Sequence, residues 1–307
     1  MSFSVVLAVG PGARERPRLR DLLTTLAVFE TSDLREVFLL DDGAGLKLEE
    51  FRGHCAEGLP LRIVPSRREG KGDAWRGGLV TNILCGMHEA IRAAEVEFVL
   101  KLDTDSLLLR PCSEQIGRAF IADPAAGILG SAFRTNVFGT AVPPSTWTVN
   151  LAKWLALIRL RRTPFPRLET AFRGRNKRIR ELTLLALEHG WPLGHCAQGG
   201  GYAVSGCLLE EWMSLGYFED ELLWRHTDLG EDIVTALLCY AAGSQVRDFN
   251  GIGEPFGVQF QGLAYPIPEL FRRNYGVIHA VKADDFAQEK AMRREIFERL
   301  CEPTAFV

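Results

Sequence analysis

Two aspartates separated by one residue, Asp103 and Asp105, follow an apolar run of strand length, Phe98–Leu102. Residues i and i+2 of a strand point to the same side, so the two carboxylates can share one target at the end of the strand. Paired carboxylate oxygens are typical ligands of a divalent cation. An Asp-x-Asp pair also occurs in helix caps and turns, so a metal site at this position needs support from other residues.

A second acidic pair, Asp41 and Asp42, follows the apolar run Val37–Leu40 and precedes Gly43. Asp-Gly is strong turn chemistry, which is one interpretation of this segment. The other is a nucleotide site, because acidic residues at strand ends of nucleotide-binding sheets accept hydrogen bonds from a ribose or a base. The residues alone leave both interpretations open.

Three consecutive glycines, Gly199, Gly200 and Gly201, precede an apolar run that ends at Ser205. Such a run costs conformational entropy on folding, so it needs a structural or a functional reason. A bulge or a tight strand crossing is the structural reason. The functional reason is that a sugar ring must approach the backbone closely at this point.

A third acidic cluster, formed by Asp228, Glu231 and Asp232, precedes an apolar helical pattern. Asp228 and Glu231 have the spacing of a capping box, which predicts a structural role for Glu231. Asp232 has no part in that cap. Its position at a helix N-terminus favours the charged form, so we expect a general base there.

Late in the chain, His279 lies on a short predicted strand, and Lys282 follows it three residues later. A single histidine on a strand is usually a packed core residue, but near an Asp-x-Asp pair it becomes a candidate third metal ligand. Lys282 is close enough in sequence to neutralise phosphate charge. Arg67, Arg68 and Lys71 form a basic stretch that belongs either to a nucleotide site or to a solvated loop.

The hydrophobic pattern predicts strands that alternate with helices. Strands are expected at Val5–Val9, Val37–Leu40, Leu61–Val64, Phe98–Leu102, Gly127–Phe133, Tyr202–Val204, Val246–Asp248 and Val277–Ala280. Helices are expected at Pro17–Phe29, Leu79–Ala94, Val149–Arg161, Lys177–His189, Leu208–Leu215, Leu229–Ala241 and Asp285–Leu300. This alternation is typical of an α/β protein with a mostly parallel central sheet covered by helices. Both acidic strand ends then lie at the carboxyl edge, where such sheets bind ligands.

The composition sets limits on the class of protein. A net charge of −3 over 307 residues gives no basic surface for nucleic acid. The seven cysteines are scattered without a CxxC pair, so reduced thiols and a cytoplasmic location are expected. The sequence predicts neither a signal peptide nor a membrane span.

The most basic part of the chain lies between Arg159 and Arg180, which holds nine basic residues. It falls within a predicted helical insertion at 140–193. A solvated helix face is one interpretation, and an acceptor site for an anionic lipid or phosphorylated glycan is another. Trp147, Trp154, Leu155 and Leu157 favour a third interpretation, in which the 147–180 region makes peripheral contact with the inner face of a membrane.

In their order along the chain, these segments resemble the GT-A glycosyltransferases, which use nucleotide-sugar donors. Val37–Gly43 is similar to the family's nucleoside-binding strand end, and Asp103-Thr-Asp105 to its metal motif. Gly199–Ser205 resembles the element beside the donor sugar, and Glu231-Asp232 the pair whose second member is the base of inverting members. His279 lies where many members supply a late histidine to the metal.

The resemblance implies one GT-A-like, Rossmann-related domain over 1–307. Its nucleotide-binding half would be 1–135, its basic helical insertion 140–193 and its acceptor and catalytic half 196–307. It further implies Mn²⁺ or Mg²⁺ held by Asp103, Asp105 and His279, and a nucleotide-diphosphate hexose, with UDP favoured, as donor. Donor contacts would come from Asp41, Asp42, Arg67, Lys71, Asp103, Gly199, Gly200, Gly201 and Lys282, and Glu231 and Asp232 would form the catalytic pair. The acceptor would be a glycan, a lipid-linked compound or a small molecule.

Three other protein classes share parts of this pattern. Haloacid-dehalogenase phosphatases place Asp-x-Asp on the first strand, whereas three strands precede it here. Sugar-1-phosphate nucleotidyltransferases share the sheet and the metal acids but carry an early Gly-rich basic loop, of which Gly10–Arg14 is a weak counterpart. A nucleotide-sugar-binding module without turnover would keep the metal site and need no base.

Overall fold

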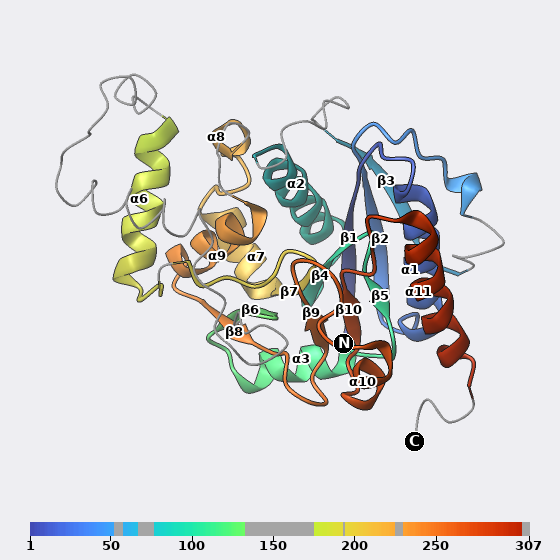
Figure 1. The fold of residues 1–307 in the computed structure, drawn as a ribbon. Coiled ribbons are helices and arrows are strands. Elements are labelled where there is room, and N and C mark those ends of the chain that lie inside the picture. The colour runs from blue at the N-terminus through green and yellow to red at the C-terminus, as the bar shows by residue number, and fades with distance from the viewer. Residues whose placement is uncertain (52–57, 67–76, 133–174, 193, 225–229, 303–307) are drawn as a thin grey trace.

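A computed structural model of the chain describes residues 1–51, 58–66, 77–132, 175–192, 194–224 and 230–302 (Figure 1). The large sheet contains β1 (Phe3–Val9), β2 (Leu34–Asp41), β3 (Leu61–Pro65), β4 (Phe98–Asp103), β6 (Ala126–Gly130), β7 (Gly201–Ser205) and β8 (Gln245–Asp248). A small sheet contains β5 (Leu107–Leu108), β9 (Phe256–Val258) and β10 (Val277–His279). The helices are α1 (Glu15–Phe29), α2 (Gly77–Ala93), α3 (Ser113–Ala122), α6 (Arg175–Glu188), α7 (Gly206–Ser214), α8 (Glu221–Trp224), α9 (Glu231–Ala241), α10 (Ile267–Arg272) and α11 (Phe286–Leu300).

The seven strands of the large sheet lie in the order β3-β2-β1-β4-β7-β6-β8. β3, β2, β1 and β4 are parallel, as are β6 and β8, whereas β7 runs antiparallel to both of its neighbours. The expected α/β class with a mostly parallel sheet is therefore confirmed. The register pairs Val9 with Asp41 and Ala8 with Asp103, so both acidic strand ends flank the end of β1.

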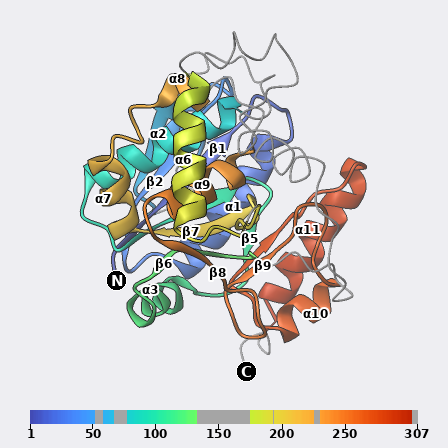
Figure 2. The ribbon, with the colours of Figure 1, turned by 90° about the vertical axis from the view of Figure 1, so that its left-hand side faces the viewer.

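The large sheet separates two apolar layers because successive side chains of a strand face opposite sides. On one side Val6, Phe38 and Val99 pack under α2, α6, α7 and α9. On the other side Val5 and Leu7 pack with α1, α3 and part of the small sheet. Figure 2 shows α6 and α7 on one side, and α10 and α11 with the small sheet on the other. Each fully buried aliphatic side chain contributes about 1.5–3 kcal/mol to this arrangement.

The small sheet delivers the end of β10 to the end of β4. β10 pairs with β5 in an antiparallel sense and with β9 in a parallel sense. β5 follows β4 after a short turn, so His279 at the end of β10 lies close to Asp103 and Asp105.

An ion cluster joins α1 to α11. Arg18 binds both carboxylate oxygens of Glu289, at 2.6 and 2.7 Å. Arg14 and Arg293 lie 3.6 and 3.7 Å from the same carboxylate, and Arg293 also pairs with Asp21 at 2.8 Å. The Glu289 side chain is only 1% exposed. These five residues, the α1/α11 ion cluster, fasten the last helix against the first.

The expected strands and helices within the described residues are all present, with ends shifted by a few residues. β5, β9, α3, α8 and α10 were not expected. All but α3 are six residues or shorter, which is too short to recognise in sequence, whereas α3 has ten residues. The expected helix Val149–Arg161 lies outside the described residues. The six cysteines of the described part form no disulfide, and no described helix is long and apolar enough to cross a bilayer.

Of the Arg159–Arg180 segment, the structure describes only the six residues 175–180, at the start of α6. There Arg178 pairs with Asp220 at 3.2 Å and lies over the ring of Tyr217. Trp147, Trp154, Leu155 and Leu157 lie outside the described residues. The membrane and acceptor interpretations of this segment therefore stay predictions.

Candidate metal centre and donor cleft

Asp103, Asp105 and His279 come together at the carboxyl edge of the large sheet. One ligand atom from each of these residues lies within 4.8 Å of the others. Backbone hydrogen bonds hold them there: the Asp103 N–H donates to Gly200 O at 3.1 Å, and the Val281 N–H donates to Asp105 O at 2.8 Å. The three residues expected from the sequence to hold a metal are thus adjacent in space.

The His279 ring is oriented by a backbone carbonyl. Its Nδ1 lies 2.7 Å from Gln259 O, and since a carbonyl only accepts, Nδ1 carries a proton in this hydrogen bond. Nε2 then faces Asp105 Oδ1 at 3.0 Å and Asp103 Oδ2 at 3.6 Å. Nε2 is buried, and these two carboxylate oxygens are its polar neighbours among the described residues. An imidazole nitrogen that faces two carboxylate oxygens fits a divalent cation, with a ligand set suited to Mn²⁺ or Mg²⁺.

Each aspartate of the pair uses one oxygen on a lysine and turns the other toward His279. Lys101 Nζ lies 2.6 Å from Asp103 Oδ1, and Lys282 Nζ lies 2.7 Å from Asp105 Oδ2. Burial opposes the ionisation of Asp105, but the His279 hydrogen bond and the Lys282 charge outweigh it and hold its pKa well below the usual range. The Asp105 carboxylate is therefore ionised at neutral pH.

Glu231 is buried behind this centre, where its Oε1 lies 2.9 Å from Lys101 Nζ. Burial raises the pKa of Glu231 to about 7, Lys101 acts in the opposite direction, and Asp103 and Asp232 add to the rise. Burial alone would lower the pKa of Lys101, but Asp103 and Glu231 outweigh it and raise the pKa above its ordinary value. Lys101 is therefore a permanent cation inside the protein.

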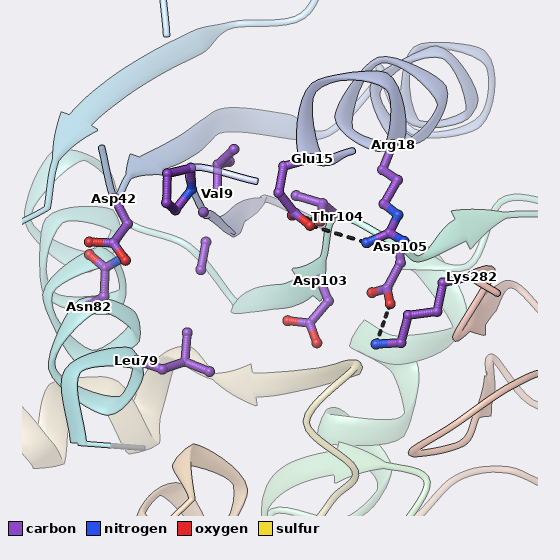
Figure 3. Close-up of a pocket in the computed structure, with 13 residues that line it drawn as sticks. Val9, Glu15, Arg18, Asp42, Leu79, Asn82, Asp103, Thr104, Asp105 and Lys282 are labelled. Carbon is purple, nitrogen blue, oxygen red and sulfur yellow. Dashed lines mark hydrogen bonds and ion pairs between the residues drawn. The ribbon is translucent and has the colours of Figure 1, made fainter. Parts of the chain in front are cut away.

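A cleft of about 250 Å³ opens beside the metal centre (Figure 3). Asp103, Asp105 and Lys282 lie at one end of it, and Asp42 lies beside Asn82 at the other. Between them the backbone at the end of β1, including Gly10 and Pro11, forms part of the wall. The cleft therefore has a charged end at Asp103, Asp105 and Lys282 and a polar end at Asp42 and Asn82.

The cleft is also lined by the first turn of α1. Glu15 accepts a hydrogen bond from Thr104, and Arg18 pairs with Glu15 at 3.2 Å (Figure 3). Arg18 is thus shared between the cleft and the α1/α11 ion cluster.

The two neighbouring aspartates after β2 have different environments. Asp41 Oδ1 accepts from the Ala44 and Gly45 N–H groups at 2.6 and 3.1 Å, and Oδ2 accepts from the Leu46 N–H at 2.8 Å. These hydrogen bonds match the turn interpretation of Asp41, and its contact with a nucleotide stays a prediction. Asp42 is buried and lines the cleft, and its donor contact stays a prediction.

The glycine run makes room for protein side chains. A Cβ on Gly200 would lie 2.1 Å from His279 Nδ1, and one on Gly199 would lie 2.8 Å from Glu231 Oε1. A Cβ on Gly201 would meet Leu102, Val277 and Val258 at 3.3–3.4 Å. The close approach expected of a donor sugar is thus made at Gly200 by the imidazole. Donor contacts of the three glycines stay predictions.

The capping prediction for Glu231 is wrong. The N-cap of α9 is Gly230, with no side-chain cap, and Glu231 is the first helical residue, so its carboxylate is turned inward to Lys101. Asp228 lies outside the described residues. Asp232 is half-buried at the same helix end, with Oδ1 accepting from the Ile233 N–H at 2.9 Å and Oδ2 lying 3.8 Å from Cys196 Sγ. Arg67, Arg68 and Lys71 lie outside the described residues.

Comparison with known proteins finds similarity only at the level of three-dimensional structure. Neither a protein-family model nor a curated protein sequence matches the chain. Residues 1–349 of S. aureus TarS, in complex with UDP-GlcNAc, are 15% identical at a TM-score of 0.43, covering 97% of this chain and 72% of TarS. In another TarS structure of the same residues the chain spans only 58% of the TarS chain, at a TM-score of 0.40.

The chain is also similar to glucosyl-3-phosphoglycerate synthase from Mycobacterium tuberculosis, in complex with Mn²⁺, UDP-glucose and phosphoglyceric acid. There the identity is 15% and the TM-score 0.41, covering 96% of this chain and 77% of the synthase. At these TM-scores the likeness assigns neither a family nor an activity to this chain.

Sequence reasoning missed Lys101, Glu15, Arg18 and Asn82. Lys101 carried a usable signal, because a lysine inside the apolar strand Phe98–Leu102 has the same i, i+2 spacing to Asp103 as Asp103 has to Asp105. A buried lysine needs an anionic partner, which was a reason to look for one. Glu15, Arg18 and Asn82 carried no such signal, because they lie on helices whose orientation to the cleft depends on tertiary packing.

Proposed function

We propose that this protein is a metal-dependent glycosyltransferase that moves a hexose-type sugar from a nucleotide-diphosphate sugar to an acceptor hydroxyl. The observation that carries the proposal is the meeting of Asp103, Asp105 and His279 at the carboxyl edge of the sheet, beside an open cleft. A buried imidazole nitrogen that faces the oxygens of two carboxylates supports a metal site more than a purely structural cluster. UDP is the donor nucleotide that we propose, and the acceptor is a glycan, a lipid-linked compound or a small molecule.

The cleft supports an extended donor. The diphosphate would lie at the end formed by Asp103, Asp105 and Lys282, and the nucleoside toward Asp42 and Asn82. Lys282 is 41% exposed, so its ammonium can leave Asp105 for a phosphate oxygen. A bound divalent cation would neutralise the charge that develops on the departing diphosphate.

Asp232 is the proposed general base, which would take the proton of the acceptor hydroxyl for in-line attack with inversion at the anomeric carbon. Its carboxylate is half-buried at a helix N-terminus, where the ionised form is favoured. Glu231, turned inward onto Lys101, would support that helix end. Retention of configuration in the product, measured by NMR, would remove Asp232 from this role.

The first experiment is a thermal-shift screen of nucleoside diphosphates and nucleotide sugars, with and without Mn²⁺. A ligand at one hundred times its Kd stabilises the folded state by about 2.7 kcal/mol, so a specific donor gives a clear rise in Tm. The proposal expects a rise that depends on Mn²⁺. A screen in which no nucleotide raises Tm in the presence of Mn²⁺ would count against it.

The second experiment separates an enzyme from a binding module. Asp232→Asn should lower kcat/KM by about 10²–10⁴-fold while leaving donor affinity unchanged, since a base acts only in the chemical step. Asp123→Asn is a matched control, because Asp123 pairs with Arg247 at the end of α3 and is 41% exposed. Equal turnover by the two variants would contradict the role of Asp232.

The nucleotidyltransferase alternative is weakened by Arg14. That class usually carries a basic residue in the early loop, but here the Arg14 guanidinium donates to Ala283 O and Asp284 O at 2.9 and 3.0 Å. It also contributes to the α1/α11 ion cluster. Arg14 is therefore used for structure.

A further inference from the structure

Lys101 is a lysine with no exposed surface in the middle of β4. Removing an ammonium from water costs several kcal/mol unless its charge and its donors are matched. An ammonium has three N–H donors, and three acceptor groups surround this one. Asp103 Oδ1 lies at 2.6 Å and Glu231 Oε1 at 2.9 Å, and Gly199 O accepts a hydrogen bond.

These contacts leave Lys101 no donor for a ligand. It is also absent from the residues that line the cleft. Lys101 therefore acts on bound molecules only through the groups that it holds.

Each of those groups belongs to a different part of the site. Asp103 is a metal ligand at the end of β4, and Glu231 begins α9, where the proposed base Asp232 follows it. Gly199 precedes Gly200, against which the His279 ring packs. One ammonium thus joins the metal ligand, the helix carrying the proposed base and the backbone supporting the imidazole.

The contact with Asp103 also selects which oxygen is presented. Oδ1 is held by Lys101, so Oδ2 is the oxygen that faces His279 Nε2, at 3.6 Å. Without the lysine, the carboxylate could rotate about χ2 and lose this direction. We infer that Lys101 is a positioning residue that fixes Asp103 as a one-oxygen ligand of a divalent cation and couples the metal centre to the start of α9. This inference rests on the proposed metal site.

The sign of the effect on metal affinity tests this inference. Removing a cation near a metal ligand lowers electrostatic repulsion, so charge alone predicts tighter Mn²⁺ binding without Lys101. Loss of positioning predicts the opposite, a weakening of about 10–100-fold, as found for residues that orient metal ligands. Weaker binding therefore cannot be an effect of the removed charge.

The experiment is an EPR titration of free Mn²⁺ against the full-length protein, without nucleotide. Lys101→Met alone would leave Glu231 buried without its cation, and this variant could fail to fold. The test variant is therefore the double change Lys101→Met with Glu231→Gln, which removes both buried charges. Glu231→Gln alone is the matched control, because it leaves the Lys101–Asp103 contact in place. Circular dichroism and Tm confirm that each variant is folded.

We expect the double variant to bind Mn²⁺ about 10–100-fold more weakly than the Glu231→Gln control. Equal or tighter binding by the double variant would overturn the inference. Glycosyl transfer is measured on the same proteins. Wild-type protein that binds Mn²⁺ but transfers no sugar would refute the proposed function and leave the inference standing. If the wild-type protein transfers sugar but the two variants bind Mn²⁺ with equal affinity, the inference is refuted and the proposed function stands.

Discussion

Replacing Gly200 by alanine tests the metal centre from its backbone side. The added Cβ would lie 2.1, 2.2 and 2.4 Å from Nδ1, Cγ and Cε1 of His279. Ordinary van der Waals contact begins near 3.4 Å, so the ring must retreat by more than about 1 Å. His279 is 3% exposed and its ring is hydrogen-bonded to Gln259 O, so the ring cannot move without losing this hydrogen bond and its packing contacts.

A displacement of about 1 Å is large compared with the tolerance of about 0.2 Å on metal–ligand distances. We therefore expect Gly200→Ala to weaken Mn²⁺ binding by at least about 10-fold. Overpacking should also destabilise the fold by about 1–3 kcal/mol. EPR titration of Mn²⁺ measures the first effect, and chemical denaturation measures the second.

Gly201→Ala is the control for this substitution. Its Cβ would meet Leu102, Val277 and Val258 at 3.3–3.4 Å, so these side chains need to yield by only a few tenths of an ångström. Mn²⁺ affinity should stay at the wild-type value in this variant. Wild-type Mn²⁺ affinity in Gly200→Ala would refute the reasoning. If donor affinity alone fell, the glycine would instead be needed for the approach of the sugar.

Two further predictions follow from the cleft and from the α1/α11 ion cluster. Asp42→Ala should weaken nucleoside diphosphate binding, measured by calorimetry, because Asp42 lines the cleft. Asp41→Ala should instead lower the free energy of unfolding by about 1–3 kcal/mol, because three N–H groups lose their acceptor. Weaker nucleotide binding in Asp41→Ala together with unchanged nucleotide binding in Asp42→Ala would contradict this assignment. Burial tends to raise the pKa of Glu289, but the Arg18 contacts outweigh it and hold the pKa below its ordinary value of 4.5. Ionised Glu289 therefore stabilises the fold above about pH 4.5, and this contribution is lost as the pH falls through the folded-state pKa. The Tm difference between wild type and Glu289→Gln should be large at pH 7 and shrink toward pH 3, and a difference independent of pH would disprove this.

Much of the fold was predictable because its longer elements repeat their apolar residues at the period of a strand or a helix. The rule that parallel strands end at one edge also predicted that the acidic ends of β2 and β4 would lie at the same edge of the sheet. β5 and β9 have only two and three residues, which is too few for a period to show. The antiparallel direction of β7 was likewise out of reach, because periodicity does not record the direction of a strand.

The candidate metal ligands were predictable as types of residue, but their supports were not. Sequence spacing suggested that Asp103 and Asp105 share a target, and the structure brings His279 to them across the small sheet. Gly200 makes room for the His279 imidazole. This contact joins residues 79 positions apart and is set by the packing of β10 against β7. No local pattern contains such information.

The acidic pairs show where sequence reasoning stops. Asp41 and Asp42 are adjacent, as are Glu231 and Asp232. The sequence left open which acid of the first pair supports the fold, and it assigned support in the second pair to Glu231 through a cap that the structure does not show. Neighbouring side chains point to opposite faces of a strand and about 100° apart on a helix, so adjacent acids meet different surroundings. In both pairs the first acid is used internally, Asp41 on three backbone N–H groups and Glu231 on Lys101. An acid held in this way fixes the backbone of the acid that follows it. Variants of Asp41 should therefore be tested with variants of Asp42, and variants of Glu231 with variants of Asp232.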